Sequence, residues 1–173
     1  MPKPSATYHQ EDKSAKPQEE IKGADKIKFH LTQIQIEGNT VLTEKSLSPI
    51  YSAYLNKTVS LGDIQKIVRD ITLKYRGAGY VLSRAVLPAQ VIKKGIVKIQ
   101  VIEGYIESAA VQGSAGNSRK ILTAYGSRLS SPHYRPLNIN DLERYALLAN
   151  DIPGMQQAST VLEPPADKNA PQG

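Results

Sequence analysis

The sequence predicts an α+β protein of two tandem domains, each with the element order strand, helix, helix, strand, strand. In each domain a three-stranded sheet is covered by two helices, and the second domain lacks its last strand. Two observations predict this architecture. Residues Ile96–Glu103, between Gly95 and Gly104, are mostly β-branched or apolar, which is typical of a strand inside a sheet. The elements that precede this strand recur in the same order in the C-terminal half, which indicates a repeat of a whole domain.

The composition is that of a globular protein without disulfides. The chain has 173 residues, of which 40% are hydrophobic and 22% charged, and the absence of cysteine excludes thiolate metal sites. No segment approaches the roughly 20 apolar residues of a membrane-spanning helix, and the N-terminus carries no apolar signal core. The net charge is +6, but Lys and Arg are interspersed with Asp and Glu, which favours solvated basic faces over a phosphate-binding patch.

The domain boundaries follow from shifts in composition. Residues 1–25 are rich in Pro, Lys, Glu, Gln and Ser and show no hydrophobic period, so we expect a disordered linker there, with a recognition tail as the alternative. We expect the first domain at residues 26–106 and the second, truncated domain at residues 107–173.

The first half of the first domain predicts one strand and one helix. Alternating apolar residues indicate a strand within Ile27–Ile36, which ends at the turn residue Gly38. Thr43 is expected to cap a helix that runs from Glu44 to Leu55, with its apolar residues on one face. Pro49 lies inside this helix and is expected to kink or split it.

The second half predicts a longer helix and then an edge strand. Ser60 and Asp63 have the spacing of a capping box at the start of the helix, and Arg76–Gly79 ends it with glycines. A strand is expected at Tyr80–Leu87. Pro88 follows it, and because proline donates no ladder hydrogen bond, the strand is expected at the edge of the sheet.

The second domain repeats these elements in a shorter form. Glu107–Gln112 resembles a first strand, Asn117 opens a helix, and Asn138 or Asn140 caps another. Met155–Leu162 has the composition of a strand. No further strand follows before a polar, Pro-rich end, so we expect the chain to be a piece of a longer protein.

No pattern of catalytic residues is present. The histidines His9, His30 and His133 are far apart and show no metal-ligand spacing. Nucleophile-elbow, phosphate-loop and dinucleotide-binding motifs are absent from the sequence. We therefore expect no enzyme, no cofactor and no metal.

Several short motifs resemble those of polypeptide-transport-associated (POTRA) domains, in the version found in two-partner secretion transporters of the haemolysin-activator type. In the first domain they are Ile34–Leu42, Tyr75–Tyr80, Ala85–Gln90 and Val101–Ile106, and in the second Leu142–Arg144 and Leu147–Gly154. The resemblance covers residues 27–163. It departs from the family pattern in two ways, because the second domain's last strand with the membrane barrel is missing and residues 1–24 do not resemble the family's plug helix.

The resemblance implies a periplasmic domain of a Gram-negative outer-membrane protein. The implied partners are the N-terminal secretion domain of a secreted exoprotein and a C-terminal barrel of the same chain. An edge strand offers unpaired N–H and C=O groups, so we expect it to bind the unfolded exoprotein by β-augmentation. The residues expected at this site are Arg69 on the second helix, with Arg84 as a second contact for acidic groups, and the strand residues Val81, Leu82, Ser83, Arg84, Ala85 and Val86.

Two other functions are open at this point. A KH-type nucleic-acid-binding module also places paired helices on a small sheet, but it needs a Gly-x-x-Gly loop that the helix connection Asn56–Gly62 lacks, so no nucleic acid is expected. A purely structural envelope scaffold would show no affinity for a secreted partner.

Overall fold

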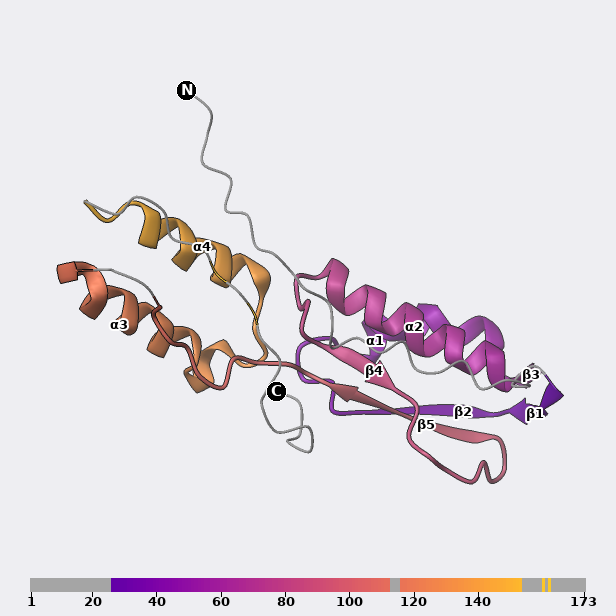
Figure 1. Ribbon diagram of the computed structural model, residues 1–173. Helices are drawn as coiled ribbons and strands as arrows, with labels where there is room; N and C mark the ends of the chain where they lie inside the picture. The colour runs from indigo at the N-terminus through magenta and orange to yellow at the C-terminus, as the bar shows by residue number, and fades with distance from the viewer. Residues whose placement is uncertain (1–25, 113–115, 154–159, 161, 163–173) are drawn as a thin grey trace. The chain divides into compact units, whose positions relative to one another are not determined.

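The computed structural model describes residues 26–112, 116–153, 160 and 162 (Figure 1). These residues fall into two compact units, an N-terminal unit that ends at Gly104 and a C-terminal unit that begins at Tyr105. Each unit is described by itself below.

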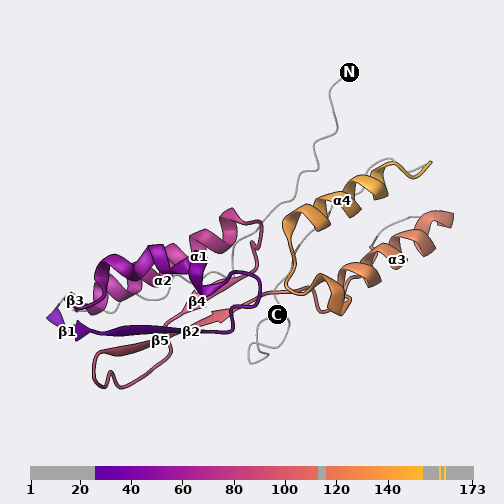
Figure 2. The ribbon, with the colours of Figure 1, turned by 180° about the vertical axis from the view of Figure 1, so that it is seen from behind.

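The N-terminal unit packs two helices on one face of a small sheet (Figures 1 and 2). The sheet order is β2-β5-β4, in which β2 and β5 are parallel and β4 and β5 are antiparallel. The central position of β5 agrees with the sequence prediction. The elements are β1 (Lys28–Leu31), β2 (Gln33–Glu37), α1 (Glu44–Tyr51), the 3-10 helix η2 (Ser52–Tyr54), β3 (Lys57–Ser60), α2 (Leu61–Gly77), β4 (Arg84–Val86) and β5 (Ile96–Ile102).

The single strand predicted within Ile27–Ile36 is divided into β1 and β2 at Thr32. At this point the carbonyl oxygen of Gly95 accepts hydrogen bonds from the backbone N–H groups of Thr32 and Gln33, at 2.8 and 3.3 Å. β1 then leaves the main sheet and pairs antiparallel with β3. The sequence did not predict β3, whose Val59 is buried in the core.

The two helices differ in how well local signals define them. α1 ends at Tyr51 and continues as the 3-10 helix η2. Pro49, inside α1, has no N–H to donate to the carbonyl of Lys45, which accepts from the Ser48 hydroxyl at 3.2 Å. Thr43 makes no side-chain cap bond. At the start of α2 the predicted capping box between Ser60 and Asp63 is present, with both reciprocal bonds formed.

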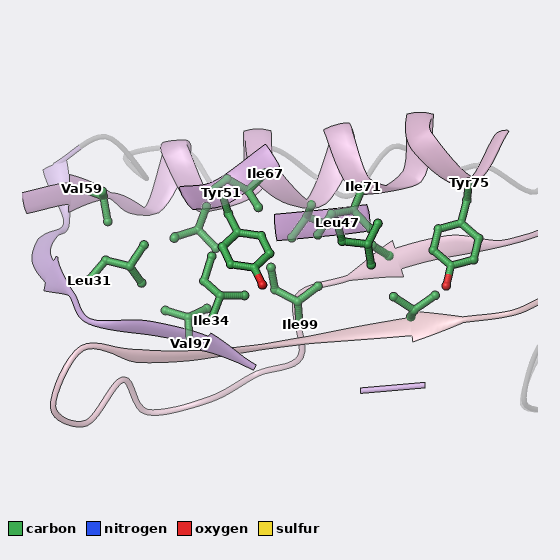
Figure 3. Packing of buried hydrophobic residues seen from close by; sticks show 14 residues of the cluster. Leu31, Ile34, Leu47, Tyr51, Val59, Ile67, Ile71, Tyr75, Val97 and Ile99 are labelled. Atoms are coloured by element: carbon green, nitrogen blue, oxygen red, sulfur yellow. The ribbon is translucent and has the colours of Figure 1, made fainter. Parts of the chain in front are cut away.

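The core lies between the helices and the sheet (Figure 3). It is made of apolar side chains from both layers, and Tyr75 of α2 is its largest fully buried member. The residues of this cluster are Leu31, Ile34, Leu47, Tyr51, Val59, Ile64, Ile67, Val68, Ile71, Tyr75, Ala85, Val97, Ile99 and Val101.

The carboxylate of Glu103 makes several hydrogen bonds at the end of the core. Oε1 of Glu103 accepts hydrogen bonds from the backbone N–H groups of Thr40 and Val41, at 2.7 and 3.1 Å, and from the hydroxyl of Tyr75 at 2.9 Å. The Thr40 hydroxyl donates to Oε2. Burial raises the pKa of Glu103, but these hydrogen bonds outweigh it, so the net pKa is lowered. Burial and the contact with Glu103 raise the pKa of Tyr75.

The C-terminal unit is a helix pair with aromatic contacts. Its elements are η3 (Gly116–Ser118), α3 (Arg119–Leu129), η4 (Pro132–Tyr134) and α4 (Ile139–Asn150). The side chain of Asn138 caps α4 by accepting from the N–H of Asn140 at 3.0 Å. The rings of Tyr134 and Tyr145 meet edge to face, and their hydroxyls lie 3.1 Å apart.

The strand predicted at Glu107–Gln112 does not form. These residues are mostly exposed, and no strand of the described part of this unit lies beside them to complete a ladder. Most of the strand predicted at Met155–Leu162 lies outside the described residues.

Candidate polypeptide-binding edge

The predicted binding strand is an edge strand, but it is shorter than expected. Among the described residues β4 pairs only with β5, and it packs against α2. The strand consists of Arg84–Val86 alone. Val81 and Leu82 lie in a turn in which the N–H of Ser83 donates to the carbonyl of Tyr80 at 3.0 Å. The prediction of a strand over Tyr80–Leu87, with Val81–Val86 as its binding edge, was therefore too long at both ends.

Ser83 has a structural role. Its side chain is buried, and its hydroxyl accepts from the N–H of Gly104 at 3.2 Å. The same glycine passes so close to Leu82 that a Cβ at position 104 would overlap its carbonyl. These contacts hold the turn against the end of β5 and leave Val81–Ser83 without a strand edge to offer.

The ladder of β5 shows which groups of β4 point outward. The N–H and C=O of Lys98 both bond to the side chain of Gln90, on the side of β5 that faces β4. Backbone N–H and C=O groups alternate between the two sides of a strand. The backbone groups of Val86 and Arg84, which pair with Gln100 and Ile102, therefore point toward β5. Ala85, between them, directs its N–H and C=O to the outer edge.

The outward N–H of Ala85 is already bound. It donates to Oγ1 of Thr72 on α2 at 2.9 Å, and the Thr72 hydroxyl donates in turn to the carbonyl of Val68 at 3.1 Å. Ala85 is only 5% exposed. α2 therefore covers the midpoint of the edge, and an added strand would first have to replace Thr72.

The predicted contacts Arg69 and Arg84 lie on different faces. Arg69 is exposed on α2, one turn before Thr72, whose side chain bonds to Ala85 of β4. Side chains alternate along a strand, so Arg84 and Val86 point away from the sheet face on which Ala85 meets the core. The structure thus places Arg69 on α2, one turn from the residue that bonds to Ala85, and Arg84 on the opposite face of the sheet.

Two residues at this edge escaped the sequence analysis. Thr72 is a polar residue at the boundary of the buried stripe of α2, and only its contact with Ala85 reveals its role. Gln90 lies two residues after Pro88. If the β4–β5 register continued, Pro88 would pair with Lys98, but proline has no N–H to donate. The Gln90 amide bonds to Lys98 in its place, donating at 2.7 Å and accepting at 2.8 Å. A glutamine just after a proline that ends a strand was the available signal.

The exposed face of α2 carries positive charge. Arg69 and Arg76 are exposed on α2, and no carboxylate of the described residues lies within ion-pair distance of either. No cluster of metal-ligating side chains occurs in the described part of the chain. Within the same residues, no helix has both the length and the apolar character to cross a membrane. The chemistry available here is charge pairing and backbone hydrogen bonding.

Residues 29–104 match the family of POTRA domains of the ShlB type. These residues form a POTRA domain. The chain is 34% identical over 134 residues to the heme/hemopexin transporter protein HuxB of Haemophilus influenzae strain 86-028NP. The aligned part covers 75% of this chain and 23% of the relative. It is 26% identical over 134 residues to the outer membrane transporter CdiB of Dickeya dadantii, covering 78% of this chain and 23% of the relative. The chain therefore spans about a quarter of the length of these relatives.

Solved structures show the same fold. CdiB from Escherichia coli superposes with a TM-score of 0.66 at 21% identity, covering 84% of this chain and 26% of that one. POTRA domains 1–3 of the periplasmic domain of Omp85 from Anabaena give a TM-score of 0.52 at 23% identity, covering 69% and 54%. POTRA domains of these transporters are periplasmic parts of outer-membrane proteins, and the predicted localisation is confirmed at this level.

The motifs by which the sequence resembles POTRA domains have structural roles here. Gly38 adopts a φ of +83° and lies against the Val101 carbonyl. Tyr75 and Glu103 join α2 to the end of β5, and Gln90 completes the ladder at Lys98. These motifs therefore stabilise the domain.

Proposed function

We propose that this chain is the periplasmic region of a two-partner secretion transporter and that it receives a secreted exoprotein in an unfolded, extended form. The partners are the N-terminal secretion domain of that exoprotein and a membrane-embedded barrel of the same polypeptide. The observation that supports this function best is an edge strand, β4, beside a helix that carries exposed cations in a POTRA domain.

The proposed contact is the addition of an extended substrate segment to β4, in which Thr72 releases the N–H of Ala85. An incoming strand gains backbone hydrogen bonds at the edge without strict demands on its sequence, which suits an unfolded substrate. At Ala85 the donor is held by Thr72, so the strand exchanges one hydrogen bond for another. The net gain per bond is then small, and we expect micromolar rather than tighter binding.

The test uses the secretion domain of the exoprotein that the neighbouring coding sequence specifies. This domain, kept unfolded in low urea, is titrated into the 173-residue chain, and amide exchange is followed by NMR. We expect saturable binding with new protection at β4. A scaffold without receptor function would show no affinity, and protection confined to another face would refute the β4 site.

A further inference from the structure

The strand β2 forms the second edge of the main sheet. In the order β2-β5-β4 it has β5 on one side, and no strand of the described residues lies on its other side. Its register with β5 runs without interruption from Gln33, opposite Ile96, to Glu37, opposite Gln100, so this edge contains no bulge. β2 therefore offers a continuous edge of five residues, whereas β4 has three.

The central strand fixes which of its own residues bond to β2. The N–H and C=O of Lys98 both bond to Gln90, on the side of β5 that faces β4. The backbone groups of successive residues alternate between the two sides of a strand. Val97 and Ile99 therefore turn their N–H and C=O toward β2.

On β2 the residues that bond to β5 alternate with residues that do not. The N–H of Gln33 donates at 3.3 Å to the carbonyl of the residue just before β5, so Gln33 faces the central strand. Gln35 and Glu37 face the same side, because they lie two and four positions further along the strand. Ile34 and Ile36 therefore direct both their N–H and their C=O to the outer edge.

β2 lacks the features that usually protect a sheet edge. Proteins commonly block an exposed edge with Pro, with Lys, with a bulge or with a covering segment. The sequence of β2 contains neither Pro nor Lys, and no side chain of the described residues bonds to the backbone of Ile34 or Ile36. On β4, by contrast, Thr72 holds the outward N–H of Ala85. The β2 edge is therefore the freer template for another extended chain.

The side chains of β2 define the kind of chain that fits beside it. Ile34 is buried in the core, and Ile36, on the same face of the strand, is only partly buried. Gln33, Gln35 and Glu37 lie on the opposite face. Apolar side chains placed beside the two isoleucines would extend the core and cover Ile36, whereas polar side chains suit the other face. The edge thus favours a segment in which apolar and polar residues alternate.

We propose that β2 is a second strand-addition edge, which takes up an extended segment of the secreted polypeptide with apolar side chains at every second position. The added segment runs antiparallel to β2, because antiparallel pairing is slightly more stable per residue than parallel pairing. The proposal rests on the proposed function for the source of the segment. It goes beyond that function in the site, since β2 and β4 are opposite edges of the sheet.

A second copy of this chain fits the edge less well than a polypeptide segment. A contact confined to two strands, each about 17 Å long, is small beside the roughly 1,200 Å² that a stable protein interface buries. A segment of an unfolded exoprotein needs no such area, because other parts of the same polypeptide keep it close to the domain. Pairing of two β2 strands is therefore the competing outcome in the test below.

The experiment titrates a peptide with the core Lys-Val-Thr-Val-Thr into the isotope-labelled 173-residue chain and follows amide exchange by NMR. In the antiparallel register its valines stand opposite Ile36 and Ile34, and its lysine stands opposite Glu37. We expect the amides of Ile34 and Ile36 to exchange at least about fivefold more slowly at saturation, whereas the amide of Gln35 already faces β5 and changes little. Absence of this protection, or protection at Ala85 alone, would overturn the proposal.

A peptide of the same composition tests the alternating pattern. In the core Lys-Val-Val-Thr-Thr only one valine lies on the face of the two isoleucines. We expect this peptide to bind severalfold more weakly than the alternating one, because one apolar contact at the edge of the core is lost. Equal affinities would contradict the predicted preference for alternating side chains.

Methylation of the peptide backbone provides the decisive comparison. In the predicted register the N–H groups of both valines donate to β2, whereas the N–H of the central threonine points away from it. N-methylation of both valines should weaken binding by at least about fivefold, since each hydrogen bond contributes a few-fold in affinity. N-methylation of the central threonine should change the affinity by less than about twofold. Equal effects of the two modifications would refute backbone pairing at this edge.

A matched pair of variants tests the same point from the side of the protein. Ile36→Pro removes an outward N–H without removing a bond to β5, as is tolerated on edge strands, and should lose most of the affinity for the alternating peptide. Gln35→Thr changes a side chain on the polar face and should keep it. Circular dichroism verifies that both variants fold. If Ile36→Pro does not fold, the methylated peptides decide the question on the wild-type chain.

The remaining outcomes are separated by two further measurements. Protection of Ile34 and Ile36 without peptide, together with a dimer in sedimentation, would assign the edge to a second copy and overturn the proposal. If the unfolded secretion domain binds with protection at β4 and none at Ile34 and Ile36, the proposed function stands and the β2 site is refuted. If this domain does not bind to the chain at all, the proposed function itself fails.

Discussion

The hydroxyl of Tyr75 on α2 donates to Oε1 of Glu103 at 2.9 Å and so ties the long helix to the end of the central strand. The same carboxylate oxygen accepts from the backbone of the loop that follows β2. One side chain thus joins three segments that are far apart in the sequence. Its removal is expected to loosen all three.

We expect Glu103→Gln to lower the free energy of unfolding by about 1.5–3 kcal/mol, because hydrogen bonds to a charged acceptor are replaced and an amide NH2 faces donors. Urea denaturation measures this difference. The matched control is Glu37→Gln, whose exposed carboxylate pairs with Lys98, and it should change stability by less than about 1 kcal/mol. Equal effects of the two changes would show that the Glu103 contacts contribute nothing special.

The same carboxylate predicts a pH dependence. Burial raises the pKa of Glu103, yet hydrogen bonds from Thr40, Val41 and Tyr75 bring the net value below 4.5, its ordinary value. The unfolded chain therefore binds the proton at higher pH than the folded chain does, and stability falls as the pH drops from about 4.5 through the folded pKa. Denaturation of wild type and Glu103→Gln between pH 6 and pH 3 should give curves that converge at the acidic end. Parallel curves would contradict this assignment.

Two glycines predict opposite effects of alanine. Gly38→Ala places a Cβ against the Val101 carbonyl at a φ of +83°, so we expect a loss of at least about 2 kcal/mol in the free energy of unfolding. Gly77→Ala, at the end of α2, meets no atom within 4 Å and should stabilise by about 0.5–1 kcal/mol. Thermal unfolding of both variants gives the comparison. A stable Gly38→Ala variant would mean that the loop can move away from β5.

Gln90 predicts a local effect on one amide. In Gln90→Leu the N–H of Lys98 loses its acceptor, so its hydrogen exchange should become faster by about tenfold while the rest of β5 keeps its protection. NMR-detected exchange reads this residue by residue. Gln100→Leu, on the exposed face of the same strand, serves as control and should leave the Lys98 amide unchanged. If Lys98 stays protected in Gln90→Leu, another group shields it.

Thr72 predicts a link between stability and binding. Thr72→Val keeps the shape of the side chain but leaves the Ala85 N–H without an acceptor, which should cost about 1–2 kcal/mol in unfolding free energy. If a strand adds at β4, the freed donor raises the affinity for the unfolded secretion domain severalfold, and Thr72→Ser restores the wild-type affinity. Unchanged affinity in both variants would place the substrate away from Ala85.

Local chemistry made part of this fold predictable. The capping box of Ser60 and Asp63, the amphipathic stripe of α2 and the Asn138 cap are encoded within a few residues, so the sequence revealed them. β3 was missed because it is stabilised by contacts with residues that are distant in the sequence. The turn before it is fixed by the Asn56 N–H, which donates to the distant Leu31 carbonyl at 2.7 Å.

The candidate site shows the same division. The edge position of β4 followed from Pro88 and from the central strand, whereas the role of Arg69 as a substrate contact stays a prediction. Val81–Ser83 were wrongly assigned to a strand, because the strand's start depends on the contact between Ser83 and Gly104. The bond between Thr72 and Ala85 has no sequence signal, since it depends on the packing of helix on sheet.

The parallel pairing of β2 with β5 has a mechanical consequence. β2 lies near the point where the chain enters the POTRA domain, and β5 ends where the chain leaves it. Tension between these two points pulls the neighbouring strands in opposite directions along their length. The hydrogen bonds between the two strands are then loaded in shear, so they share the force and do not break one after another. The domain is thereby built to withstand traction along its own chain.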